Sequence, residues 1–349
     1  MNPQILFLVS LFLVFQNCQN PREQARPIST ERLIPKYAKG FSIDYFSDST
    51  VIHTHVLGDS ADFTIRQPLK RIVCLSSTHV GAMCLLNARD KIIGVSSRNY
   101  LYDSALISFP LAELGEANLL NIEKLYALKP DLVMLFTIDP TSNGVIHKLQ
   151  KTGIPYIVNA EFKETSPLAQ AEWIKLFGAL TDRAMAADSI FTEVEDHYLS
   201  IKKRRAEISK RPKVLINIPW NGVWYISGKE SIIAQLIADA GGHYLFDQLQ
   251  ANGNIPMSFE GVYANGKEAD YWINTGICKR KSDLLQEDAK LKLFQAYNRN
   301  NLFNNINRIR QEGGNDFWET GVMRPDLVLE DLELILTGQH PRNFYRRLD

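Results

Sequence analysis

One uninterrupted helical segment near the middle of the chain limits the folds that this sequence can adopt. Residues 182–210 contain neither glycine nor proline. Apolar side chains recur there on one helical face, at Ala187, Ile190, Phe191, Val194, Tyr198 and Ile201. A helix of roughly 26 residues would be about 39 Å long, the width of a whole domain. In a chain of 349 residues, long enough for two domains, this segment predicts a stiff connection between two folded units.

Strands and helices alternate on both sides of that segment. Before it, the apolar strands RIVCLS (71–76), KIIGVS (91–96) and DLVMLF (131–136) are separated by stretches with helical spacing. After it, the strands KVLINI (213–218) and ADYWINT (269–275) repeat the arrangement. Near-continuous apolar strands that alternate with helices are typical of parallel sheets covered on both faces. We therefore predict an α/β fold of two Rossmann-like lobes with mostly parallel sheets, joined by one long interlobe helix.

The N-terminus has the pattern of an exported protein. Residues 5–15, ILFLVSLFLVF, are apolar and uncharged but too short to span a bilayer, which suits the core of a secretory signal. Cys18 follows shortly, as at the processing site of lipoproteins, where the thiol is acylated and anchors the protein. Gln16 and Asn17 are bulkier than the residues that usually precede such a cysteine, so an ordinary signal cleaved near Cys18 is the alternative. We expect export across the inner membrane to the periplasm, with lipid on Cys18.

A short β-rich stretch precedes the first lobe. Residues 36–70 contain the runs FSIDYF, VIHTHV and DFTIRQ, separated by Ser, Asp and Gly. His53 and His55 share one strand face, which indicates either a metal pair or a polar surface. The predicted organisation of the chain is a signal peptide 1–17, a flexible tether 18–35, an N-terminal β element 36–70, an N-terminal α/β lobe 71–181, an interlobe helix 182–210 and a C-terminal α/β lobe 211–349.

The two halves contain an internal repeat. NIEKLYALKPDLV at 121–133 matches SFEGVYANGKEADYW at 258–272 with a two-residue insertion, and Glu123 pairs with Glu260. Asn121 and Ser258 are both good N-caps, so each glutamate falls in the first turn of a short helix. A negative charge is favourable at that position. The repeat indicates two similar lobes with an equivalent carboxylate on each.

The chain resembles the class III periplasmic substrate-binding proteins, which serve ABC importers of cobalamin, ferric siderophores and haem. The similarity lies in residues 71–97, in the motif NIEKLYALKPDLVM and in residues 223–246. Three further segments resemble a branch of the family with an added N-terminal β element, namely 36–70, 161–178 and 313–321.

This resemblance implies a function. It points to an extracytoplasmic protein that captures an iron chelate (siderophore or haem) or a corrinoid between its lobes and delivers it to a dimeric membrane permease. It also implies that Glu123 and Glu260 are the carboxylates at the lobe tips that pair with arginines of the two permease subunits. No cofactor is expected besides the metal chelate carried as ligand, and the protein is expected to act as a monomer.

Residues that follow the strands are candidates for ligand binding, because ligands of open α/β sheets bind beyond the carboxyl ends of the strands. A large planar chelate favours aromatic walls with few polar anchors. The candidate ligand-binding residues are His79, Arg98, Tyr100, Trp220, Trp224, Tyr225 and Trp318. Trp220 and Trp224 flank the turn at Asn221–Gly222, where large aromatic side chains have little core to fill.

Composition and motifs argue against other classes of function. The chain has 39 Lys and Arg against 39 Asp and Glu, a balance unlike that of nucleic-acid-binding proteins. It lacks the GxSxG, HExxH, Walker A and GxGxxG motifs, so we expect no enzyme and no catalytic residues. The four cysteines lack the paired spacing of a zinc site, and no protein-bound metal is expected. One alternative is a carrier of molybdate or another small metal oxyanion, held by His79, Arg98 and helix N-termini.

Overall fold

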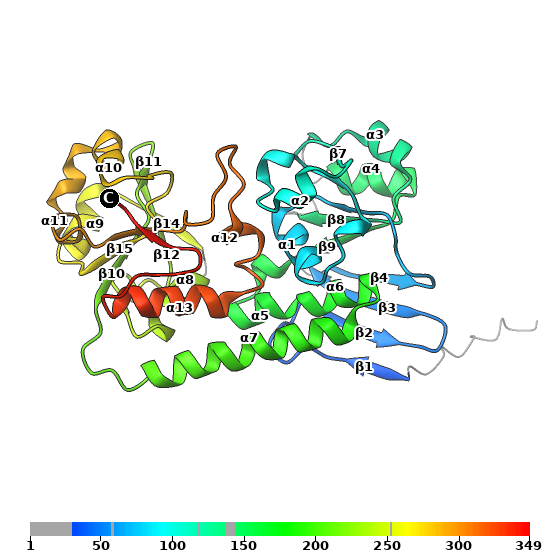
Figure 1. Cartoon of the computed structure of the whole chain (residues 1–349), viewed down its shortest axis with the longest axis horizontal. Coiled ribbons are helices and arrows are strands. Elements are labelled where there is room, and N and C mark those ends of the chain that lie inside the picture. Colours follow the sequence, from blue (N-terminus) through cyan, green and yellow to red (C-terminus); the bar gives the residue numbers. More distant parts are fainter. Residues whose placement is uncertain (1–29, 57–58, 117–118, 137–143, 252) are drawn as a thin grey trace, which may run out of the picture.

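The computed structural model describes residues 30–56, 59–116, 119–136, 144–251 and 253–349 (Figure 1). Two α/β lobes lie side by side, and the long helix α7 (Ala184–Arg205) runs beneath both. It has 22 residues, fewer than the 182–210 expected. It begins late because Asp182 adopts a left-handed conformation (φ 60°) that ends the preceding helix α6 (Ile174–Thr181). In the part of the chain that the structure describes, no helix is long and apolar enough to cross a membrane.

The N-terminal lobe is built on a five-stranded sheet in which all strands are parallel, in the order β7-β6-β5-β8-β9. Its strands are β5 (Ile72–Cys74), β6 (Ile92–Val95), β7 (Ala112–Glu113), β8 (Leu132–Phe136) and β9 (Tyr156–Asn159). Its helices are α1 (Ser77–Leu85), α2 (Ser104–Ile107), α3 (Ile122–Leu128), α4 (Gly144–Thr152), α5 (Pro167–Glu172) and α6. Separate apolar clusters cover the two faces of the sheet, as the continuous apolar strands predict.

The C-terminal lobe repeats this plan with one reversed edge strand. Its sheet has the order β13-β10-β15-β16-β17, and only β17 is antiparallel. Its strands are β10 (Lys213–Ile216), β13 (His243–Tyr244), β15 (Tyr271–Ile273), β16 (Leu302–Asn304) and β17 (Arg346–Arg347). A small antiparallel sheet adds β11 (Pro219–Trp220), β12 (Val223–Ser227) and β14 (Asn254–Met257). The helices are α8 (Ile232–Asp239), α9 (Phe259–Gly266), α10 (Lys281–Glu287), α11 (Gln295–Asn298), α12 (Asp316–Glu319) and α13 (Pro325–Leu336).

The N-terminal β element is a four-stranded antiparallel sheet. Its strands, in sequence and spatial order, are β1 (Glu31–Leu33), β2 (Phe41–Tyr45), β3 (Thr50–Val56) and β4 (Asp59–Ile65). It begins before residue 36, because β1 lies within the segment expected to be a tether. His53 is bonded to two aspartates of its own sheet, Asp44 (3.1 Å) and Asp62 (2.7 Å), and the described residues contain no group of ligands suited to a metal.

Two buried carboxylates fasten the start of this element to the N-terminal lobe. Glu172 accepts hydrogen bonds from the backbone N–H groups of residues 36–38, at 2.7–3.0 Å. Glu164 accepts those of Lys39 and Gly40 (2.9 Å each) and the indole N–H of Trp173 (3.0 Å). Each carboxyl group thus accepts three hydrogen bonds, which offset the cost of burying it.

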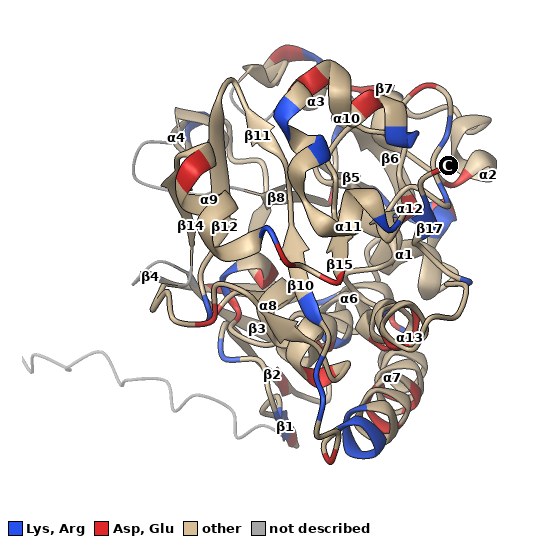
Figure 2. Ribbon diagram, turned by 90° about the vertical axis from the view of Figure 1, so that its left-hand side faces the viewer, with Lys and Arg blue, Asp and Glu red and all other residues tan. Residues whose placement is uncertain are grey.

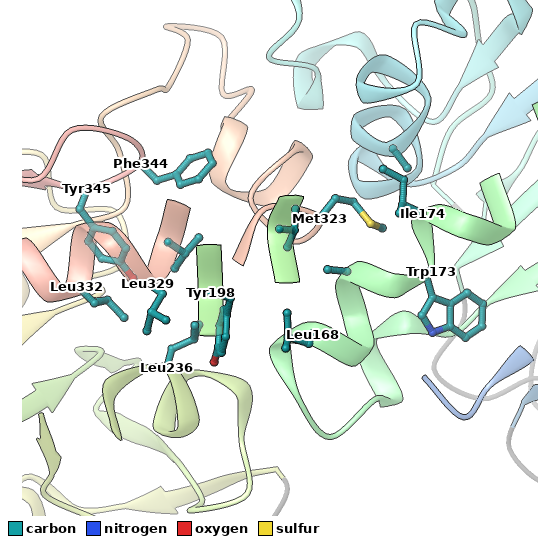
Figure 3. Close-up of a cluster of buried hydrophobic side chains, with 14 of the residues drawn as sticks. Leu168, Trp173, Ile174, Tyr198, Leu236, Met323, Leu329, Leu332, Phe344 and Tyr345 are labelled. Carbon is teal, nitrogen blue, oxygen red and sulfur yellow. The ribbon is translucent and has the colours of Figure 1, made fainter. Parts of the chain in front are cut away.

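The two lobes share one hydrophobic core along α7. Side chains from α5, α6, α7, α8 and α13 meet there, as Figure 3 shows for Leu168, Trp173, Tyr198, Leu236 and Leu332. Tyr198 lies on the buried face of α7, and its hydroxyl donates to Asp239 at the end of α8 (2.7 Å). A continuous core beneath the lobes favours a limited hinge motion over wide opening.

Candidate functional site

A cavity lies at the carboxyl edge of the C-terminal sheet. The chain leaves the central strand β10 at Asn217 and its neighbour β15 at Asn274, and both residues have positive φ (61° and 57°). The strand order reverses between these two strands, because β13 lies on one side of β10 and β16 beyond β15. Such a switch point is where open α/β sheets bind ligands. A cavity of about 420 Å³ opens there, lined by Asn217, Asn274, Gly276, Ile277, Lys279, Asn305, Ile306, Ile309, Asn315 and Trp318.

Asparagine amides and apolar side chains dominate this cavity. The Asn217 amide donates to the carbonyl of Tyr225 (2.9 Å), and the Asn274 carbonyl oxygen accepts from the hydroxyl of Tyr345 (2.7 Å). Each side chain is thereby fixed by one end, and its other polar atom has no partner among the described residues. Ile277 and Trp318 are largely exposed at the rim, and Lys279 is the one charged residue among those lining this cavity.

The hairpin β11–β12 carries two further exposed aromatic side chains, and its Tyr225 carbonyl is bonded to Asn217 of the cavity wall. Trp220 is 68% exposed, and its ring centroid lies 6.4 Å from that of Tyr225. Alternation along β12 places Trp224 on the opposite face. Trp224 is completely buried, stacks on Trp272 (5.7 Å between centroids) and donates its indole N–H to the carbonyl of Ile216 (3.1 Å). The expectation that Trp224 lines the cleft is therefore corrected, because this side chain belongs to the lobe's core.

On the N-terminal side, His79 is also a core residue. Its side chain is completely buried, with its ring centroid 6.0 Å from that of Phe177 on α6. Burial lowers the pKa of His79 to about 3, so the imidazole is neutral in this environment. It sits in the first turn of α1, on the face that packs against α6 rather than at the helix tip. The expectation that His79 contacts a ligand in the cleft is corrected on this ground.

Arg98 and Tyr100 are nearer the surface and have partners of their own. The Arg98 guanidinium donates to the carbonyls of Ile107 and Leu111 (2.6 Å each). Its role is to hold the loop between β6 and β7, which leaves little donor capacity for an anion. Tyr100 is half exposed, and its hydroxyl donates to Glu116 (2.6 Å).

The structure thus brings together only part of the expected set. Trp318 lines the cavity, and Trp220 and Tyr225 lie on the adjoining hairpin. The sequence-based reasoning missed the asparagines at 217, 274 and 305. Asn217 and Asn274 fall within the predicted strands 213–218 and 269–275 and not after them, and no predicted strand precedes Asn305, so the rule of residues that follow strands did not select them.

The helices α3 and α9 carry the repeated glutamates. The Asn121 side chain accepts from the N–H of Lys124 (2.8 Å), and that of Ser258 accepts from Gly261 (3.2 Å), so both expected caps are present. Glu123 and Glu260 are exposed, and neither carboxylate has a hydrogen bond or ion pair within the described ranges. Figure 2 shows acidic residues on both helices, at the surface of their lobes.

Comparison with known proteins agrees with this architecture. A family described as periplasmic binding protein matches residues 72–305, more than half of the chain. An uncharacterised lipoprotein of Methanocaldococcus jannaschii is 26% identical over 306 residues, which cover 83% of this chain and 70% of that protein. A cobalamin-binding protein of Halobacterium salinarum is 25% identical over 201 residues, or 57% of this chain and 52% of the other.

Solved structures share the fold. The structure of an ABC-type Fe³⁺-hydroxamate transport system from Saccharomonospora viridis superposes with a TM-score of 0.60 at 20% identity, covering 81% of this chain and 98% of the other. At this identity the likeness concerns the fold alone. The match over residues 72–305 is to substrate-binding proteins of transporters rather than to enzymes, and it includes the N-terminal lobe, the long helix and the C-terminal lobe as far as β16. The chain therefore belongs to the periplasmic binding protein family.

Proposed function

We propose that this protein captures a metal chelate in the interlobe cleft and delivers it to the permease of an ABC importer. The observation that carries the proposal is the cavity at the strand switch point, with its asparagine amides and the exposed ring of Trp318 on its wall. A wall of aromatic surface with a few fixed polar groups suits a large, flat or apolar ligand. The protein is expected to bind one ligand as a monomer.

The asparagine side chains of the cavity favour uncharged chelates that are rich in amides or hydroxamates. Carboxamides offer both donors and acceptors without charge. They match ligands rich in amides or hydroxamates, such as corrinoids and hydroxamate siderophores. The carboxylates of haem and the charged oxygens of catecholate siderophores call for cationic partners, and this wall offers Lys279 alone. The names of the similar proteins from Halobacterium and Saccharomonospora support the same two classes.

The two side chains expected to hold molybdate are engaged elsewhere. That alternative relied on His79, Arg98 and helix N-termini as anion ligands. The His79 ring is buried against Phe177, and Arg98 is bonded to two carbonyls. We therefore do not propose a small oxyanion as the ligand.

The cleft aromatics provide the test of this proposal. Trp318→Ala and Trp220→Ala should each weaken chelate binding by about 1–3 kcal/mol, the range for losing one stacked aromatic surface. The measurement is a calorimetric titration with cyanocobalamin, ferrioxamine, haemin and molybdate in turn. Tyr126→Ala serves as a matched control, because Tyr126 is an exposed aromatic residue on α3 outside the cavity. Unchanged affinity in both tryptophan variants would place the ligand elsewhere.

We further propose that Cys18 is acylated and anchors the protein to the membrane. Residues 1–29 lie outside the described part of the chain, so the proposal rests on the apolar run before Cys18 and on the similar lipoprotein of Methanocaldococcus. Cys18→Ala should move the protein from the membrane fraction to the soluble fraction, since the lipid is its only proposed anchor. Fractionation followed by immunoblotting measures this. A variant that still sediments with membranes contradicts the anchor.

The exposed glutamates of the repeat suit permease docking. Substrate-binding proteins of ABC transporters act together with membrane permease components. We propose that Glu123 and Glu260 are the two matching contacts, one from each lobe, to a permease built of two similar subunits. Support comes from their equivalent places in the first turns of α3 and α9 and from their exposure without a partner in the described chain.

A further inference from the structure

Residues 308–324 of the C-terminal half lie directly on the N-terminal lobe. A Cβ atom on Gly81 of α1 would lie 1.8 Å from the carbonyl oxygen of Glu319, and one on Gly314 would lie 2.0 Å from that of Leu101. Only glycine permits such an approach of two backbones. Arg310 adds a hydrogen bond to the Leu101 carbonyl (2.9 Å). The segment therefore adds a second connection between the two lobes, and Figure 1 shows α12 between them, above the long helix α7.

Two adjacent residues of the short helix α12 have different environments: one lines the cavity and the other is buried against the N-terminal lobe. Trp318 lines the cavity at Asn217 and Asn274 and is 57% exposed. The next residue, Glu319, is 1% exposed, and its two oxygens accept the backbone N–H groups of Tyr102 (2.6 Å) and Asp103 (3.1 Å). Thr78 also donates to the Trp318 carbonyl (3.3 Å). We propose that α12 is a clasp between the lobes and that Glu319 is the positioning residue that holds Trp318 at the cleft.

The proposal rests on the proposed function only in that Trp318 would face the ligand. The clasp itself is a property of the protein without ligand. Because Glu319 is a buried titratable group, we expect the strength of the clasp to depend on pH, which a contact without a titratable group would not do.

Glu319 lacks a cationic partner although arginines surround it. A second cavity, of about 620 Å³, flanks the clasp, and four arginines and three carboxylates line it. The arginines are already paired, Arg89 with Asp103 (2.7 Å), Arg308 with Asp316 (3.0 Å), Arg310 with Glu312 (2.8 Å) and Arg324 with Asp326 (2.8 Å). The remaining titratable side chains of the lining are the phenol of Tyr102 and the buried thiol of Cys84 on α1. Among the described residues, Glu319 has no ion pair.

This environment raises the pKa of Glu319 to about 7. The main cause is burial, and the nearby charges of Asp316 and Asp103 act in the same direction, while the two N–H donors oppose it. The clasped state therefore favours the neutral carboxyl. The contribution of Glu319 to the stability of the clasped state is complete below the ordinary glutamate pKa of 4.5. It is lost as the pH rises through about 7. We expect a clasp that is tight in mild acid and loosens above neutrality.

Fluorine NMR of protein labelled with fluorotryptophan tests this expectation without any ligand. The Trp318 resonance, assigned with Trp318→Phe, should shift between about pH 5 and about pH 9 with a midpoint near 7. Glu319→Gln should abolish that titration. Asp316→Asn should move the midpoint to lower pH, because it removes a neighbouring negative charge. Glu207→Gln, an exposed glutamate just beyond the end of α7, should leave the midpoint unchanged, and the Trp220 resonance should not titrate.

Two results would overturn the clasp. One is a Trp318 resonance that does not titrate in this range. The other is a midpoint unmoved by Asp316→Asn, which remains decisive if Glu319→Gln does not fold. A protein that passes this test yet binds no chelate would refute the proposed function and leave the clasp standing, so the two failures are distinguishable.

Discussion

Reversing the charge of both repeat glutamates should abolish uptake while leaving ligand affinity nearly unchanged. In Glu123→Arg with Glu260→Arg, each proposed contact with a permease arginine becomes a contact between like charges. Such juxtapositions cost several kcal/mol, so permease affinity should fall on the order of 100-fold or more. Both side chains are exposed and neither lines the cavity, so ligand binding there should be unaffected. Binding of the variant to permease in detergent or nanodiscs, together with uptake in cells, measures the effect.

A matched control reverses two other exposed glutamates. Glu31→Arg with Glu207→Arg changes the net charge by the same amount, on β1 and just beyond the end of α7. This control should transport normally, and the wild-type contact should weaken with added salt. Uptake at the wild-type rate by the variant of α3 and α9 would show that these carboxylates are not the docking residues.

Trp224→Ala should destabilise the protein far more than any change at the cleft rim. The side chain is fully buried, stacks on Trp272 and packs against Phe294, and its loss would leave the Ile216 carbonyl without its donor. Truncating a buried tryptophan lowers the free energy of unfolding by about 3–5 kcal/mol. Trp220→Ala, four residues away and 68% exposed, should change it by less than about 0.5 kcal/mol.

Urea unfolding followed by circular dichroism separates these two variants. Trp224→Phe should recover part of the loss, because a smaller ring still fills some of the space between Trp272 and Phe294. Equal unfolding midpoints for Trp224→Ala and the wild type would mean that this tryptophan is not the core residue that the structure shows.

The overall architecture could be predicted because it depends on patterns that extend over many residues. Continuous apolar strands between helical stretches specify a parallel sheet covered on both faces, and both lobes have one. The caps at Asn121 and Ser258 could be predicted for a similar reason, since each needs only its own helix. Short elements such as the two-residue strand β7 could not be predicted, because two residues are too few to show a periodic pattern.

The site was harder to predict because it depends on which way single side chains point. Trp220 and Trp224 look equivalent in the sequence, but the register of the hairpin sends one outward and the other into the core. His79 follows a strand, as a cleft residue should, yet its place on the inner face of α1 buries it. Asn217 and Asn274 become visible as a pair only when the strand order brings β10 and β15 together.

The central claim is that this protein carries a metal chelate in the cleft, and analysis of the loaded protein tests it most directly. The full chain would be isolated after growth with iron, cobalt and molybdenum sources, then examined by native mass spectrometry and metal analysis. The account predicts one iron or cobalt chelate per chain, with occupancy strongly reduced in Trp318→Ala. A protein that carries molybdate, or a chelate whose occupancy is unaffected by both Trp318→Ala and Trp220→Ala, would contradict it.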